Sequence, residues 1–173
     1  INAKPRRPDG LTRIVYGSGS ASHDTDFRQC SDAILDILRK NYHVRLTIIG
    51  TLNLPPVFKE VETQIERVPP SDYATYLARL AKCDINIAPL EPSVFNDAKS
   101  NIKYLEAAIL RVPSVCSPTQ EFRNTVTHGE TGLLASSMEE WKECISSLIS
   151  DPARRAYIGR QAFEHVLHHY TPQ

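Results

Sequence analysis

The feature that most constrains the fold is a regular alternation of short β-rich runs with amphipathic helical patterns. The β-rich runs cover residues 13–16, 44–49, 65–68, 85–90, 113–116 and 132–135. Apolar residues recur at helical spacing between them. Strands that alternate with helices pair in parallel, because each return to the same edge of a sheet needs a crossover. The pattern predicts a doubly wound, Rossmann-like α/β domain with a parallel sheet and helices on both faces.

Capping signals mark where the helices begin. Asp26 precedes the first helical pattern and Ser71 precedes the second. Ser137 with Glu140 is typical of a capping box before an apolar run. From there the chain is helical over 137–150 and 151–169, which predicts a C-terminal helical tail beside the sheet.

Helical spacing also predicts which side chains face the core. Phe27, Cys30, Ile34, Ile37 and Leu38 recur at such spacing in the first long pattern. The same spacing relates residues 73, 77 and 80, and residues 102, 105 and 109. We therefore expect these positions to be buried.

Composition favours one globular domain preceded by a linker. The chain has 173 residues, of which 41% are hydrophobic and 23% charged, and its 20 basic and 20 acidic residues balance. A net charge of zero gives no global field that attracts nucleic acid. Every apolar run falls short of the roughly 18 residues that span a bilayer. Residues 1–10 are polar, basic and proline-rich, which predicts a hinge from a missing upstream domain, with 11–173 forming the domain itself.

Cysteine and histidine spacing gives no sign of a metal site. The four cysteines lie far apart without a CxxC pair, so we interpret them as reduced core thiols of a cytosolic protein. His165 and His169 share a helical face, but no glutamate stands at the position that a zincin motif needs. We expect no metal here.

The loop after the first β-rich run is a candidate binding loop, because ligands of open parallel sheets bind beyond the carboxyl ends of the strands. It begins Gly17-Ser18-Gly19, and its glycines permit close backbone approach to a phosphate. Ser22 replaces the third glycine of GxGxxG, and no Walker lysine follows. The residues leave open a mononucleotide-binding loop or a plain turn.

The loop after the fourth β-rich run is the stronger candidate. Ser100 or Asn101 can cap the helix that follows, which leaves first-turn amides free for an anion. Lys99 and Lys103 flank that turn, and Glu106 can accept two ribose hydroxyls. The alternative is a solvated turn in which Lys103 and Glu106 form an ordinary helix pair.

Four segments in this order resemble retaining GT-B glycosyltransferases of family 4. Residues 99–106, KSNIKYLE, are similar to the donor-site helix of that family, and 107–115 to its next strand. The turn at 127–134, the first loop at 16–27 and the helical tail also resemble the family. The resemblance runs from about residue 13 to residue 171.

The resemblance implies two Rossmann-like domains that face each other across a cleft, with this chain as the C-terminal, nucleotide-sugar-binding half. Of the two family glutamates seven residues apart, Glu106 matches the one that grips ribose. The earlier one falls on Ala98, so sugar recognition must differ. The usual first-loop arginine is absent, and His23 with Lys99 or Lys103 takes its place. The base is expected against the loop around Val68.

The expected activity is transfer of a sugar from a nucleotide diphosphate to a glycan or lipid-linked acceptor, without cofactor or required metal. Acceptor contacts, and hence turnover, would need the missing half. The resemblance implies a cytoplasmic protein that meets the inner face of the membrane peripherally. A non-catalytic nucleotide- or partner-binding module remains the alternative. Lys103 and Glu106 are the expected catalytic residues, and the expected donor-binding residues are Gly17, Ser18, Gly19, His23, Val68, Asn96, Asp97, Ala98, Lys99, Ser100, Asn101, Lys103 and Glu106.

Overall fold

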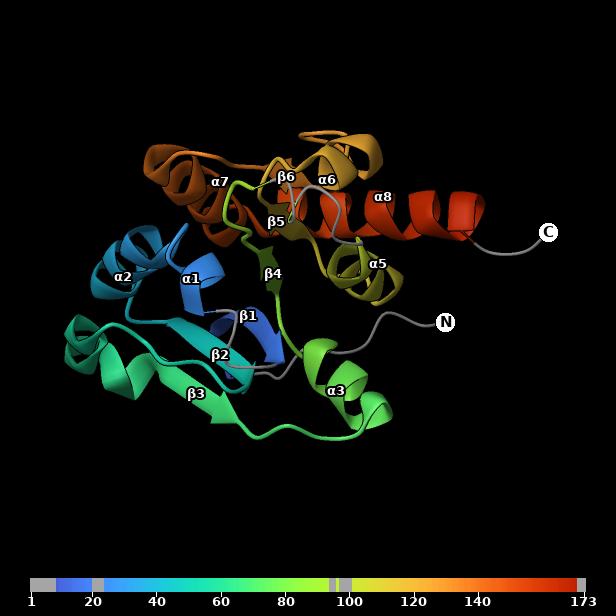
Figure 1. Ribbon diagram of the computed structural model, residues 1–173. Coiled ribbons are helices and arrows are strands. Elements are labelled where there is room, and N and C mark those ends of the chain that lie inside the picture. Colours follow the sequence, from blue (N-terminus) through green and yellow to red (C-terminus); the bar gives the residue numbers. More distant parts are fainter. Residues whose placement is uncertain (1–8, 20–23, 94–95, 97–100, 171–173) are drawn as a thin grey trace.

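The computed structural model describes residues 9–19, 24–93, 96 and 101–170 (Figure 1). Its strands are β1 (Thr12–Gly19), β2 (Val44–Gly50), β3 (Ile65–Val68), β4 (Ile85–Ala88), β5 (Ser114–Cys116) and β6 (Leu133–Leu134). Its helices are α1 (Asp24–Phe27), α2 (Ser31–Lys40), the 3-10 helix η2 (Pro56–Gln64), α3 (Tyr73–Leu80), α5 (Ile102–Ile109), α6 (Gln120–Thr125), α7 (Met138–Ser150) and α8 (Pro152–Tyr170).

One six-stranded sheet runs in the order β3-β2-β1-β4-β5-β6, and every pairing in it is parallel. The chain winds outward from β1 to β3 and returns beside β1 at β4. The predicted doubly wound α/β fold is therefore confirmed. The direction of winding changes between β1 and β4, and this is where open α/β sheets bind ligands.

Alternate residues of β1 enter two different cores. Ile14 and Tyr16 pack into the apolar cluster that α2 and α7 form with the sheet. Val15 points the other way and packs with Leu80 of α3. Both faces of the central strand are therefore covered, as Figure 1 shows for the helices on either side of the sheet.

The first predicted helix is broken in two, and Asp26 does not cap it. Asp26 lies inside α1, buried, and its carboxylate accepts the Glu91 backbone N–H at 2.8 Å and the Asn96 Nδ2 at 3.3 Å. It therefore ties α1 to the loop after β4. The prediction that Asp26 caps the helix was wrong, because its carboxylate accepts hydrogen bonds from the loop after β4 and not from the first turn of a helix.

The other capping predictions had mixed outcomes. The second helix is capped by Asp72 rather than Ser71, since the Asp72 carboxylate accepts the Thr75 N–H at 2.8 Å. The capping box at α7 is confirmed: the Ser137 hydroxyl and the Glu140 carboxylate each accept the other's backbone N–H at 3.1 Å.

Helix α5 turns a different face to the core from the one that its large aliphatic residues predict. Ile102 and Ile109 are 50% and 37% exposed. The buried side is made of Tyr104, Ala107 and Ala108 instead. Small alanines allow close approach of α5 to α8 and the sheet, so burial here follows backbone distance rather than side-chain size.

Three further sequence features can be compared with the structure: the cysteines, the apolar runs and the candidate metal ligands. Cys30, Cys83 and Cys116 are buried, Cys144 is half-buried, and all four are free thiols. Within the described ranges, every helix is too short or too polar to span a bilayer. The same residues contain no group of three or more side chains suited to hold a metal ion. Of the linker expected at 1–10, residues 1–8 lie outside the residues that the structure describes.

Candidate functional site

A cleft of about 340 Å³ opens at the carboxyl ends of β1 and β2. The loop before α3, the start of α3 and the first half of α5 complete its walls. Its position is the one that the winding of the sheet predicts. The lining residues are Gly17, Ser18, Gly19, Ile49, Gly50, Pro70, Ser71, Tyr73, Tyr76, Ile102, Lys103 and Glu106.

The floor of the cleft is nearly bare backbone. Gly19 and Gly50 pair across β1 and β2, with φ of 63° and 111°, in the region that glycine alone adopts readily. A Cβ on Gly50 would lie 2.8 Å from the Ser18 Oγ and 3.0 Å from the Gly19 nitrogen. The Ser18 hydroxyl donates to the Thr51 carbonyl at 2.6 Å. The floor is therefore held in place, and Gly19 and Gly50 are its residues that remain exposed or half-buried, whereas Gly17 and Ser18 are buried.

Two tyrosines of α3 form one wall. The rings of Tyr73 and Tyr76 are stacked, with centroids 6.3 Å apart and planes 22° apart. Tyr73 is 60% exposed, whereas the Tyr76 hydroxyl lies so near Gly17 that a Cβ there would meet it at 2.5 Å. Burial raises the pKa of Tyr76, so its hydroxyl stays neutral. The exposed Tyr73 ring offers the cleft a flat apolar surface.

Glu106 faces the two tyrosines from α5. It is only 8% exposed, and burial raises its pKa above the usual value. A hydrogen bond from the Tyr73 hydroxyl and the charge of Lys103 act in the opposite direction, but they do not offset the burial. The alternative was a solvated turn in which Lys103 and Glu106 form an ordinary helix pair. It is wrong for Glu106, because this residue is buried. A buried carboxylate in a cleft has acceptor capacity to offer a ligand.

Lys103 lies one turn before Glu106 on α5. Its ammonium nitrogen is 4.9 Å from the centre of the Tyr16 ring, which packs in the sheet core. Lys103 therefore reaches back toward β1, whose end forms the cleft floor. The cleft combines a carboxylate, a cation and glycine backbone within one opening.

The structure gathers five of the predicted site residues and leaves others elsewhere. Gly17, Ser18, Gly19, Lys103 and Glu106 all line the cleft. Residues 23 and 97–100, that is His23, Asp97, Ala98, Lys99 and Ser100, lie outside the described residues. The expected roles of those five therefore stay predictions.

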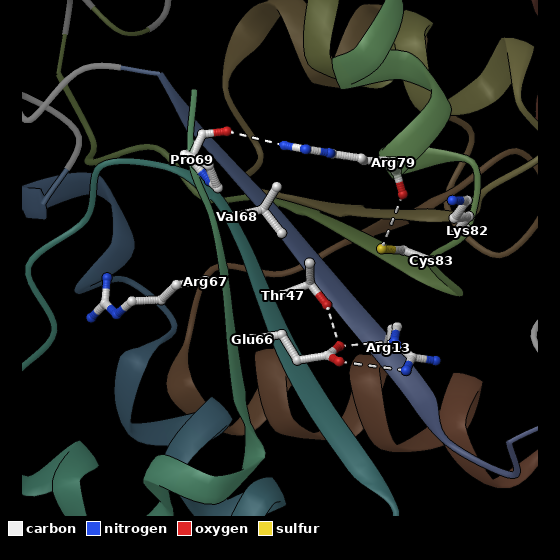
Figure 2. A pocket seen from close by; sticks show the side chains of 9 residues that line it. All are labelled: Arg13, Thr47, Glu66, Arg67, Val68, Pro69, Arg79, Lys82 and Cys83. Carbon is white, nitrogen blue, oxygen red and sulfur yellow. Dashed lines mark hydrogen bonds and ion pairs between the residues drawn. The ribbon is translucent and has the colours of Figure 1, made fainter. Parts of the chain in front are cut away.

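Val68 lines a different cavity, of about 310 Å³, on the sheet face beside α3 (Figure 2). The floor of this cavity is polar: Arg13 and Thr47 donate to the Glu66 carboxylate at 2.8 and 3.0 Å. Pro70 and Ser71, further along the same loop, line the cleft, and the base contact expected around Val68 stays a prediction.

The two predicted asparagines make internal contacts. Asn96 Nδ2 donates to the Asp26 carboxylate and to the Glu91 carbonyl. Asn101 stands at the N-cap of α5, but its side chain does not cap the helix. Its amide is buried against other elements, so the capping expected of Asn101 was wrong. Neither asparagine is among the residues that line the cleft.

Tyr73, Tyr76 and Gly50 line the cleft but were not predicted as site residues. Tyr73 was expected in the core, because its helical spacing matched that of Leu77 and Leu80. Gly50 ends β2, and the rule that ligands bind at carboxyl ends of strands applies to it as well as to β1. That rule was the available signal for Gly50.

The sheet, its order and its cleft define a Rossmann-like domain of the kind that binds ligands at the carboxyl ends of its strands. Within that class, the chain belongs to the family described as glycosyl transferase-like, whose model matches residues 28–173. It is also 26% identical over 140 residues to the D-inositol 3-phosphate glycosyltransferase of Pseudarthrobacter chlorophenolicus. That match covers 75% of this chain and 32% of the relative, so the chain spans about a third of that protein.

Solved structures confirm the fold. The C-terminal domain of the glycosyl transferase group 1 family protein LpcC from Francisella tularensis superposes with a TM-score of 0.73 at 19% identity, covering 94% of this chain and 87% of that one. TarM gives a TM-score of 0.76 at 12% identity, covering 99% and 35%. HepE of Anabaena, solved in complex with UDP, gives 0.70 at 15% identity, covering 91% and 44%.

Proposed function

We propose that this chain is the donor-binding half of a retaining glycosyltransferase, which takes a sugar from a nucleotide diphosphate and transfers it to a glycan or lipid-linked acceptor. Membership of the glycosyl transferase-like family and the match to an isolated C-terminal domain of this class support the proposal. Because the chain spans 32% of the relative from Pseudarthrobacter chlorophenolicus, the proposal assigns acceptor contacts to a second domain.

The observation that carries the proposal is that Lys103 and Glu106, both on α5, line the same cleft as the glycines of its floor. A carboxylate has the acceptor capacity for both hydroxyls of a ribose. A lysine near a helix N-terminus can neutralise a diphosphate. At the exposed end of the floor, Gly19 has no side chain that would keep a phosphate away from the main chain.

The same arrangement favours bond cleavage. Negative charge develops on the departing diphosphate as the glycosidic bond breaks, and groups fixed where that charge appears stabilise the transition state. Lys103 and the positive end of the α5 dipole are the fixed groups on this chain. The exposed ring of Tyr73 offers the base a stacking surface.

UDP is the first nucleotide to test, because HepE and a TarM variant, both solved relatives of similar fold, hold UDP. We expect calorimetric titration to show binding of UDP with a dissociation constant in the micromolar range, where nucleotide–protein contacts of this kind commonly fall. GDP and ADP, titrated in parallel, report on base preference. A sugar form that binds better than its bare nucleotide would support a transferase, whereas equal binding would favour the non-catalytic module.

Donor binding should not require a divalent metal, because Lys103 and helix amides already supply positive charge at the diphosphate. The expected result is the same affinity for UDP with a chelator as with added magnesium or manganese. Binding that disappears with chelator and returns with metal would contradict this assignment.

A further inference from the structure

The first turn of α5 is held in place by side chains rather than by a cap. Asn101 precedes the helix, is 8% exposed, and makes no side-chain cap. Its Nδ2 donates to the Thr125 hydroxyl of α6 at 2.9 Å and to the Tyr170 hydroxyl of α8 at 3.4 Å. One buried amide thus connects three helices beside the first turn of α5, whose Ile102 and Lys103 line the cleft.

Two further hydrogen bonds hold the same turn from the sheet side. Asn86 of β4 donates to the Lys103 carbonyl at 3.5 Å, and the Tyr104 hydroxyl donates to the Thr131 carbonyl at 2.7 Å. These bonds fix the turn against β4 and the loop before β6. The Asn101 bonds tie it to α6 and to the last turn of α8.

We propose that Asn101 is a positioning residue for the diphosphate, acting with Thr125 and Tyr170 as a clamp on the first turn of α5. This inference rests on the proposed function. The clamp aims the first-turn N–H groups and Lys103 at the bound phosphates. The last turn of α8 thereby becomes part of the support of the donor site.

The clamp should act on phosphates and spare the nucleoside. First-turn N–H groups and Lys103 lie next to Asn101 and move with it. Glu106 lies a turn further on, where Ala107 and Ala108 pack against the core. Hydrogen bonds of this kind lose strength steeply with misalignment, so a displaced first turn weakens the phosphate contacts before the ribose contact.

The test compares UDP with uridine on matched variants. Asn101→Ala removes the clamp, and Tyr170→Phe removes only one hydroxyl from a side chain that is 46% exposed. Thr125→Val removes the acceptor, whereas Thr125→Ser keeps it. We expect Asn101→Ala and Thr125→Val to weaken UDP binding about fivefold to tenfold and uridine binding less than about twofold. Tyr170→Phe should give a smaller loss of the same kind, and Thr125→Ser should retain wild-type affinity.

Each outcome decides the proposal. A lowered melting temperature with unchanged UDP affinity, measured well below that temperature, makes the clamp merely structural and overturns it. Equal losses for UDP and uridine also overturn it, because they indicate general damage to the cleft. Should Asn101→Ala fail to fold, Tyr170→Phe and the Thr125 pair decide alone. A wild-type chain that binds no nucleotide overturns the proposed function together with the clamp.

Discussion

Replacement of Glu106 by alanine is expected to lower UDP affinity tenfold or more. Each charged hydrogen bond from a ribose hydroxyl to the carboxylate contributes about 1.5 to 3 kcal/mol, and tenfold in affinity corresponds to about 1.4 kcal/mol. Loss of even one such bond therefore reaches the expected effect. The dissociation constant from calorimetric titration measures it, with melting temperature as the control on folding.

Glu106→Gln distinguishes binding from stability. Burial raises the pKa of Glu106, which means that the folded protein disfavours its ionised form. The neutral amide should therefore raise the melting temperature at neutral pH while it weakens UDP binding. Glu139→Gln changes an exposed carboxylate in the first turn of α7 and is the control: it should leave UDP affinity unchanged and slightly lower the melting temperature, because it loses a favourable charge at a helix N-terminus. Unchanged UDP affinity in both Glu106 variants would remove this residue from the site.

Lys103→Ala completes the comparison. A lysine that contacts the diphosphate should affect UDP more than uridine, while Glu106→Ala should affect both ligands. Equal effects of Lys103→Ala on the two ligands would mean that this lysine does not contact the phosphates. The two variants thus assign the ends of the ligand to two positions on one helix.

UDP affinity should also fall as the pH is lowered toward the acid range. Ribose hydroxyls donate to the ionised carboxylate, so bound UDP favours ionisation and protonation competes with binding. In the protein without bound UDP, burial raises the pKa of Glu106 above 4.5, the ordinary value for glutamate. As the pH is lowered, UDP affinity should therefore begin to fall at a pH above 4.5. Titrations between pH 4.5 and 8 check this. The pH slope should be smaller in Glu106→Gln, and an equal slope in both proteins would contradict the assignment.

The fold was predictable from the sequence because parallel α/β proteins carry their periodicity in every element. The strand predictions at 44–49 and 65–68 match β2 and β3 closely, and the all-parallel order followed from strict alternation. The face of α5 was not predictable in the same way. Helical spacing places the buried face where the large aliphatic residues recur. Ala107 and Ala108 are buried instead, because α5 lies close to α8 and the sheet there.

The candidate site was predictable where it depends on local chemistry. Gly17, Gly19, Lys103 and Glu106 stand at strand ends or in the first turns of a helix, where residue type and position already indicate a role. Tyr73 could not be found in this way, because an aromatic residue at helical spacing is typical of a core. Only the tertiary position of α3 against α5 shows that its ring faces the cleft.

Buried polar residues were the hardest to predict. Asp26, Asn96 and Asn101 all looked like caps or ligand-binding residues, since their side chains suit both roles. Each makes a hydrogen bond to a polar group far away in the chain. A sequence shows which groups can donate or accept, but the partner of a buried group is set by the packing of elements far apart in the chain.

Gly159→Ala is expected to destabilise the fold by about 2 to 3 kcal/mol, although alanine is the better helix former. Gly159 lies buried in α8, and a Cβ there would overlap with the Arg111 carbonyl oxygen, which belongs to backbone that cannot yield cheaply. Helix propensity alone would stabilise by about 1 kcal/mol, whereas overpacking costs about 1 to 3 kcal/mol and more when backbone must move. Arg111 already has φ of 60°, so the loop that must move is constrained.

The sign of the change tests this contact directly. Overlap predicts a lower midpoint in chemical denaturation, and propensity predicts a higher one. Arg160→Ala, at the next and exposed position of α8, changes helix propensity little and creates no overlap, so it should stay within about 0.5 kcal/mol of the wild type. Because α8 supports α5 at this contact and through Tyr170, Gly159→Ala should also weaken UDP binding. A Gly159→Ala protein more stable than the wild type would show that α8 does not approach the Arg111 loop closely.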